Sequence, residues 1–387
     1  MFIKLFFPFI LIFSLIKYTF FLVFLSHFSF RKVSFNKNKI PSRVFIIPQR
    51  FLGDIIITSQ ILDNLIKLNP KIKITILQYN SKIFEKIYKE RLGQNLEAIV
   101  NYDGFFTTIT KILNLGNFDI VIRFASSSAR RSIFALMIKS FYKYTIVRTK
   151  RIRFKILNDK HIIKQNTNND NYLQLCNKKI NKILGTNFKP SFFLPLIPVD
   201  LSNHFQDKSL LDTIKNKDKN KKIIILAPGA SFYAKMWSDE NFNKLSLYLQ
   251  EKRFLVFLLE GGLNHEKDLP LKISHNLLIK KELDFDTIFN IIASSDLLIS
   301  NDSGFAHISV ALGVKTIVIP AFMSMDIYGY KFFDNFHTVL PTTDCYPCNI
   351  PAINKNCPYY KKDNNGKARC INSISLNSVK NLIDNVL

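Results

Sequence analysis

Acidic side chains are scarce in this sequence. Its 387 residues include 29 Asp plus Glu against 54 Lys plus Arg, which gives a formal net charge of +25. Such an imbalance favours acidic partners, and these fall into three classes: nucleic acid, anionic lipid and phosphorylated small molecules. The basic residues are dispersed and no recognised RNA or DNA module occurs, so we expect no nucleic-acid partner.

Metal-ligand patterns are also few. His161 and His204 stand alone, with no further ligands spaced nearby, so neither predicts a metal site. The exception is a C-x2-C-x8-C-x12-C pattern near the C-terminus, made by Cys345, Cys348, Cys357 and Cys370. Four thiols with one close pair predict a structural zinc, but free thiols fit the same pattern, and disulfides would require a location outside the cytosol.

Long apolar runs occur only in the first 30 residues. Residues 5–16 and 18–30 are almost entirely apolar or aromatic, are interrupted by Lys17, and are followed by basic residues from Arg31 onwards. No small-residue cleavage site follows, which argues against a cleaved signal peptide. We therefore predict that residues 1–39 form a membrane anchor, spanning the bilayer or lying in its interface, although packing on the protein itself stays open. As an anchor, it would keep the remainder at the cytoplasmic face of the inner membrane.

The length and composition indicate two domains. With 47% hydrophobic residues in 387, the chain can form two separate α/β cores. Residues 189–200 contain three prolines without helical or strand periodicity, and residues 208–222 are strongly charged. We expect an N-terminal domain at 40–195, a linker at 196–221 and a C-terminal domain at 222–387.

The most informative stretch begins with a buried strand at Leu297–Ser300. It changes abruptly to a polar turn containing Asp302, Ser303 and Gly304, and a helical pattern starts at Phe305. Backbone N–H groups at a helix N-terminus suit a phosphate oxygen, and glycine lets the ligand approach closely. An ordinary helix cap explains the same residue types, so this alternative stays open.

A second carboxylate occupies the equivalent position in the N-terminal half. Asp54 lies between a short apolar strand and an amphipathic helix at Ile55–Leu68. Ligands of open parallel sheets bind outside the carboxyl ends of the strands, where this side chain is expected, although it would also cap the helix. Another strand, Asp119–Phe124, runs into Ser127 and Arg130, which would suit a sugar or a phosphorylated acceptor.

Small and polar residues follow two further strands of the C-terminal half. Gly229 and Ser231 form a turn after one strand, and Lys235 comes soon after it, where it could reach a phosphate as a mobile charge. Gly261 and Gly262 follow the next strand, where backbone can approach a flat ligand such as a base. A solvated lysine is the commoner case, but three such strand ends in one domain indicate a nucleotide cleft.

In combination, these motifs resemble the heptosyltransferase family, the inverting family 9 glycosyltransferases of lipopolysaccharide core synthesis. The resemblance rests on RVFIIPQRFLGDIIITSQILDNLIK, APGASFYAKMWSDENFNKL, LEGG and LLISNDSGFAHISVALGVKTIVI, in that order along the chain. It implies a GT-B architecture, in which two Rossmann-like domains face each other across a cleft. It also implies an ADP-heptose donor, a lipid-linked oligosaccharide acceptor at the inner membrane surface, and no cofactor for catalysis.

The resemblance also implies roles for individual residues. Asp54 matches the general base that takes the proton from the acceptor hydroxyl. Lys235 matches a lysine that contacts the donor phosphates, while Asp302, Ser303 and Gly304 match the loop that holds the diphosphate. A related enzyme with another nucleotide sugar or acceptor, and a silent nucleotide-sugar binding protein, are the alternatives.

Overall fold

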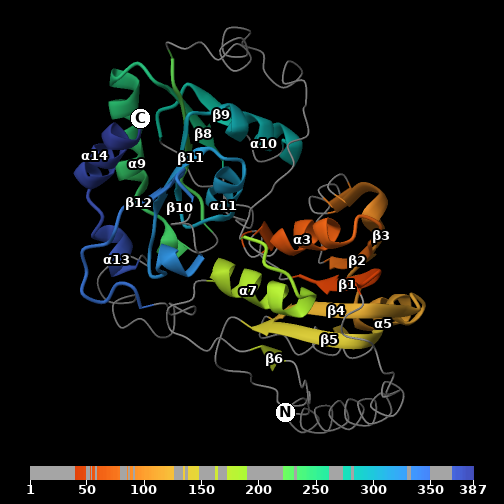
Figure 1. Ribbon diagram of the computed structural model, residues 1–387. Coiled ribbons are helices and arrows are strands. Elements are labelled where there is room, and N and C mark those ends of the chain that lie inside the picture. The colour runs from red at the N-terminus through yellow and green to blue at the C-terminus, as the bar shows by residue number, and fades with distance from the viewer. Residues whose placement is uncertain are drawn as a thin grey trace, which may run out of the picture. The chain divides into compact units, whose positions relative to one another are not determined.

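The computed structural model forms two units, each with its own sheet (Figure 1). The first unit comprises Met1–Gln49, Leu62–Asn166 and Ile183–Gly185, and the second comprises Arg50–Ile61, Thr167–Lys182 and Thr186–Leu387. The structure describes residues 40–48, 53, 55–56, 59–78, 85, 88–89, 92–125, 134–135, 138–147, 162–163, 172–189, 221–230, 233–260, 273–279, 283–328, 333–348 and 368–387. The predicted leader at 1–39 lies outside these ranges, and the predicted domain boundaries stay predictions.

The first unit contains a six-stranded parallel sheet in the order β3-β2-β1-β4-β5-β6. Its strands are β1 (Arg43–Ile47), β2 (Lys73–Gln78), β3 (Leu96–Asn101), β4 (Asn117–Ala125), β5 (Lys139–Val147) and β6 (Ile162–Ile163). The helices of this part of the chain are α3 (Gln60–Leu68), η1 (Gly93–Asn95), α5 (Phe105–Leu113) and α7 (Tyr172–Leu184). Strands β1 and β4 are the most apolar and lie in the middle, where Phe45 meets Phe118 edge to face with ring centroids 5.2 Å apart.

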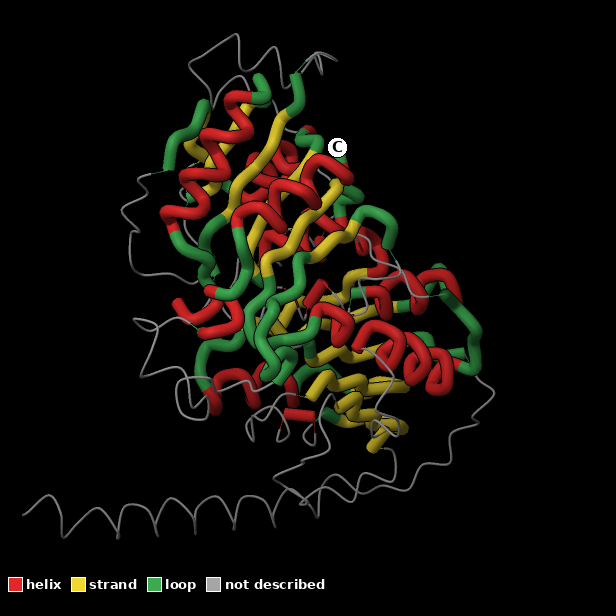
Figure 2. The backbone as a smooth tube through the Cα atoms, turned by 90° about the vertical axis from the view of Figure 1, so that its left-hand side faces the viewer, coloured by secondary structure: helices red, strands yellow, loops and turns green. Residues whose placement is uncertain are grey.

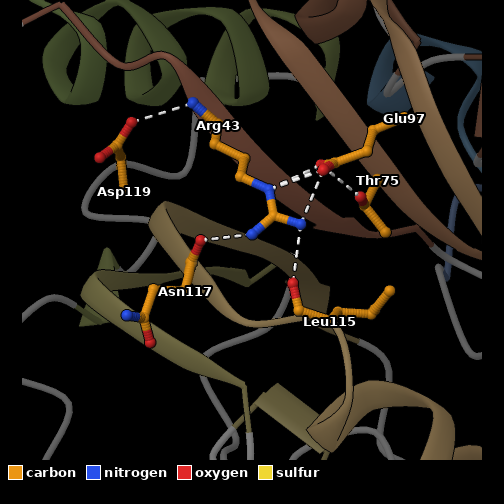
Figure 3. Close-up of polar contacts among 6 residues, drawn as sticks. All are labelled: Arg43, Thr75, Glu97, Leu115, Asn117 and Asp119. Atoms are coloured by element: carbon orange, nitrogen blue, oxygen red, sulfur yellow. Dashed lines mark hydrogen bonds and ion pairs between the residues drawn. The ribbon is translucent and has the colours of Figure 1, made fainter.

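A polar network joins the amino ends of these strands (Figure 3). The Arg43 guanidinium donates to the Glu97 carboxylate at 2.8 Å and to the backbone oxygens of Leu115 and Asn117 at 2.7 and 2.8 Å. The backbone N–H of Arg43 donates to Asp119 at 2.9 Å. These bonds connect β1 to β3 and β4, so they fix the strand register from the edge opposite the carboxyl ends.

We expect Asp119→Ala to loosen the first sheet. Its Oδ2 atom accepts three hydrogen bonds, from the Ser42 N–H, the Ser42 hydroxyl and the Arg43 N–H, and their loss would lower the local opening free energy by about 1–3 kcal/mol. Hydrogen exchange measured by mass spectrometry should be faster in peptides from β1 and β4. Asp103→Ala is the matched control, because Asp103 forms an exposed pair with Lys111. Equal exchange in both variants would contradict the assigned role of Asp119.

The second unit repeats the same topology, with six parallel strands in the order β12-β11-β10-β7-β8-β9. They are β7 (Ile223–Ala227), β8 (Leu255–Leu259), β9 (Leu277–Ile279), β10 (Leu297–Asn301), β11 (Lys315–Ile319) and β12 (Phe336–Thr338). The helices are η3 (Tyr233–Lys235), α9 (Asp239–Glu251), α10 (Phe285–Ser294), α11 (Gly304–Ala311), η4 (Met325–Tyr328), α13 (Arg369–Asn372) and α14 (Leu376–Val386). Helix α14 packs with α9, and α10 packs with α11 (Figures 1 and 2).

The two parallel sheets confirm the α/β class predicted from the sequence, while the predicted hydrophobic segment finds no support in the described residues. Helix α14 begins at Leu376, where Ser375 caps it by accepting a hydrogen bond from the Ser378 N–H. Strands β7 and β10 are buried at every residue, as expected of central parallel strands. Within the described ranges, the helices are too short or too polar to cross a bilayer.

Candidate functional site

The site of the second unit lies at the carboxyl ends of β7 and β10. These strands are neighbours, but the chain leaves β7 towards β8 and β9 and leaves β10 towards β11 and β12. Such a switch in direction opens a crevice beyond the strand ends, where ligands bind in open α/β sheets. The topology brings Gly229, after β7, beside the predicted turn of Asp302, Ser303 and Gly304, after β10.

Asn301 connects the loops on both sides of this edge. Its Oδ1 atom accepts a hydrogen bond of 3.0 Å from the backbone N–H of Trp237, and its Nδ2 atom donates to the backbone oxygen of Pro228. The side chain is fully buried, so these bonds form away from water and hold two backbone segments at fixed places. From the sequence, Asn301 was only one polar residue of a turn, and no motif signalled this connecting role.

Lys235 and Asp302 form a buried ion pair at the same edge. The Lys235 ammonium donates to Asp302 Oδ2 at 2.5 Å, with 11% and 4% of the two side chains exposed. The ammonium also lies 5.3 Å from the centre of the Phe322 ring, at the end of β11. A lysine ammonium has three N–H donors, so one cation can serve both Asp302 and an incoming anion.

The helix-cap explanation of this turn is wrong for Ser303. Ser303 is the N-cap residue of α11, but its side chain makes no capping bond to the helix. Instead, its hydroxyl pairs with that of Ser300 at 2.8 Å, and the Asp302 carboxylate faces Lys235. The first turn of α11 therefore presents its backbone N–H groups and its positive dipole end without a capping bond from Ser303, an arrangement that suits an anion.

Tyr346 belongs to the same neighbourhood and was missed from the sequence. Its hydroxyl donates to the backbone oxygen of Met323 at 3.3 Å. Burial, with a smaller contribution from the Asp302 carboxylate, raises the pKa of the Tyr346 phenol to about 12, so the phenol is neutral at physiological pH. The loop carrying Tyr346 has no helical or strand periodicity, which explains why no pattern marked it.

The remaining predicted residues divide between those that the structure describes and those that it does not. Outside the described ranges lie Asp54, Ser127, Arg130, Ser231, Gly261, Gly262 and Cys357. Their predicted roles stay predictions.

In the first unit, Arg123 is the third residue from the carboxyl end of β4. It is buried, with 6% of its surface exposed. A buried guanidinium thus lies near the carboxyl end of a central strand.

The predicted zinc site finds no support. Across the described parts of the chain, no group of three or more His, Cys, Asp or Glu side chains is arranged to hold a metal. Cys345, Cys348 and Cys370 are free thiols, and Cys348 instead directs its sulfur to the backbone oxygen of Phe322 at 3.8 Å. Burial, with smaller contributions from Cys345 and Cys348, raises the pKa of the Cys370 thiol to about 12.

Comparison with known proteins identifies the class. A curated relative, lipooligosaccharide heptosyltransferase 2 of Campylobacter jejuni strain 81116, is 33% identical over 177 residues, covering 41% of this chain and 53% of the relative. The alignment thus covers about half the length of that relative. The model of glycosyltransferase family 9 (heptosyltransferase) matches residues 107–340, more than half of the chain. These matches place the chain among the glycosyltransferase families.

It belongs to family 9, the heptosyltransferase family. A family 9 glycosyltransferase from Veillonella parvula superposes with a TM-score of 0.68 at 16% identity, covering 92% of this chain and 99% of that one. The Escherichia coli heptosyltransferase WaaC, solved with ADP-2-deoxy-2-fluoro heptose, gives a TM-score of 0.56 at 14% identity, covering 89% and 99%. At these identities, the two structures establish a shared fold.

Removing one partner of the buried pair should destabilise the second unit. Lys235→Met would leave the Asp302 carboxylate buried without its cation, at a cost of about 3–5 kcal/mol, and Lys235→Met combined with Asp302→Asn should recover most of the loss. The single tryptophan, Trp237, lies in this unit and reports its thermal unfolding by fluorescence. Lys244→Met, which breaks an exposed pair with Glu240, is the control. A single variant as stable as the double one would contradict the coupling.

Cys370 should resist alkylation. Because its thiol is buried with a pKa of about 12, we expect iodoacetamide at pH 8 to modify it at least about tenfold more slowly than Cys345 and Cys348, as measured by mass spectrometry. The folded pKa is raised from 9.0, so the stability gained from a neutral thiol is present below pH 9 and is lost as pH rises towards 12. Equal protection of all three thiols, with stoichiometric zinc, would instead restore the zinc hypothesis.

Proposed function

We propose that this protein transfers heptose from ADP-heptose to a lipopolysaccharide or lipooligosaccharide core acceptor, with inversion at the anomeric carbon. One observation supports the donor side most directly: the buried Lys235 ammonium lies beside the uncapped N-terminus of α11 in a family 9 chain. The sugar and the acceptor rest on the relatives, since one is a lipooligosaccharide heptosyltransferase and another was solved with an ADP-heptose analogue.

In this proposal the diphosphate of the donor binds at the α11 N-terminus. Backbone N–H groups at Ser303 and Gly304 would hold one phosphate, and the Lys235 ammonium would contact the other. As the bond between the anomeric carbon and the diphosphate oxygen breaks, negative charge grows on the departing nucleotide diphosphate, and the ammonium and the helix dipole would stabilise it without a metal. Gly229 and Ser231 would form the opposite wall, and Gly261 and Gly262 would lie against the base.

Asp54 would act as the general base. The acceptor hydroxyl oxygen attacks the anomeric carbon from the face opposite to the diphosphate, the new glycosidic bond forms as the old bond to the diphosphate oxygen breaks, and ADP departs with the electron pair. The hydroxyl proton passes to the Asp54 carboxylate. Ser127 and Arg130 would contact the acceptor on this side, where Arg123 adds a buried positive charge.

We place the protein at the cytoplasmic face of the inner membrane as part of the same proposal. The support comes from the sequence: an apolar leader at 1–39, basic residues directly after it, and a net charge of +25. A lipid-linked acceptor lies in that surface, so an anchored enzyme would meet its substrate in two dimensions rather than three.

The decisive experiment combines donor choice with one substitution. The purified full chain in detergent, with EDTA and a truncated lipid A core acceptor, should release ADP from ADP-heptose only when acceptor is present. Asp54→Asn should lower kcat by about 10²- to 10⁴-fold and leave ADP binding, measured by calorimetry, unchanged. Asp63→Asn, in the described helix α3, is the matched control and should retain full activity.

Three other outcomes would revise the proposal. Release only from a UDP- or GDP-sugar would keep glycosyl transfer and reject heptose. Full activity in Asp54→Asn would reject the assigned base. Binding of ADP without turnover of any donor would favour the silent binding protein.

A further inference from the structure

The Gly53 backbone lies against the imidazole of His307. A Cβ atom added at Gly53 would stand 2.3 Å from both Cδ2 and Nε2 of His307 and 2.9 Å from its Cε1. Carbon atoms in van der Waals contact lie about 3.5–4.0 Å apart, so no side chain fits between this backbone and the ring. Both residues belong to the second unit, because the segment Arg50–Ile61 groups with it.

Close approach, rather than backbone conformation, is what requires glycine here. The glycines with positive φ in the described chain are Gly93, Gly104, Gly116, Gly185 and Gly313, and Gly53 is absent from that set. An alanine would therefore meet no φ strain at this position. The three atoms nearest to an added methyl group all belong to the His307 ring.

The His307 ring cannot easily move aside. It lies in the first turn of α11 with 7% of its surface exposed, and its neighbours Phe305, Ala306 and Ile308 are also buried. Helix α11 packs against β10, β11 and α10, which enclose it. Helical side chains are also restricted at χ1, so a swing of the imidazole would have to displace packed groups.

We propose that His307 is a positioning residue for the catalytic base, which rests on the function proposed above. Asp54 directly follows Gly53, and a planar peptide unit fixes the distance between their Cα atoms at about 3.8 Å. A shift of Gly53 away from the His307 ring would therefore also shift the start of the residue that follows it in the chain. Because the same helix presents its N-terminus at Ser303 and Gly304 to the donor, one rigid element sets both the base and the diphosphate.

This role differs from a contact between His307 and the donor. A positioning residue acts on the proton-transfer step, so its loss lowers kcat while donor affinity is kept. A donor ligand acts on binding, so its loss raises the Kd for ADP. A purely structural residue would lower the melting temperature without separating kcat from binding.

The test is a double-mutant cycle on the full chain, with kcat, KM, the Kd for ADP and the melting temperature measured for each variant. Gly53→Ala should lower kcat about 100-fold, because a displacement near 1 Å at a reacting group costs about that much, and should leave the Kd for ADP within about twofold. His307→Ala should lower kcat about tenfold. The double variant should recover about tenfold over Gly53→Ala, since the methyl group then occupies the space of the ring. His337→Ala, which truncates a half-buried histidine in β12, is the control and should not change kcat.

The outcomes separate this inference from the proposed function. Multiplicative losses in the double variant, or a large rise in the Kd for ADP with His307→Ala, would overturn the positioning role. If the unmodified protein transfers no sugar, the proposed function fails on its own, whereas the melting temperatures still report the Gly53–His307 contact. Non-additive melting temperatures would then confirm the contact and remove its catalytic meaning.

Discussion

The pairing of Lys235 with Asp302 is the interaction on which the second unit's site depends. A lone ammonium with 11% exposure would lose most of its hydration without compensation, so the carboxylate at 2.5 Å is what allows a positive charge to be kept there. Asp302 in turn stands one residue before the α11 N-cap, where the helix dipole favours a negative charge. The pair therefore holds a cation beside a helix N-terminus without a metal ion.

That pair is held in place by backbone rather than by more charges. The side chain of Asn301, the residue before Asp302, accepts from the backbone N–H of Trp237 and donates to the backbone oxygen of Pro228. Trp237 in turn donates its indole N–H to the backbone oxygen of Ile374 at 2.9 Å. Each of these bonds is buried, so the loops after β7 and β10 are fixed relative to each other before any ligand arrives. Preorganised dipoles of this kind stabilise developing charge more effectively than groups that must reorient.

The sequence predicted the central strands of both sheets and missed edge strands and the interior strand β5 (Lys139–Val147). The runs at Ile223–Leu226 and Leu297–Ser300 became β7 and β10 to within one residue, because central parallel strands are apolar throughout. Strands β3 and β9 were not recognised, since they are edge strands with partly exposed residues and no clear alternation.

In the site, turn chemistry pointed to Asp302 and Lys235, whereas Tyr346 and the Gly53–His307 contact come from segments far apart in the chain. Local patterns carry no signal of such contacts.

The switch in strand direction explains why so few residues suffice for the proposed chemistry. Each unit has two neighbouring strands at its centre, β1 with β4 and β7 with β10, and from the two strands of each pair the chain continues in opposite directions across the sheet. Gly53 follows β1 but rests on α11, the helix that follows β10. A general base and a diphosphate site must be aligned to a fraction of an ångström for an in-line displacement, and flexible loops alone would not hold them. In the proposed mechanism, the contact of Gly53 with the buried His307 ring would supply that alignment, since the backbone itself is the packed surface.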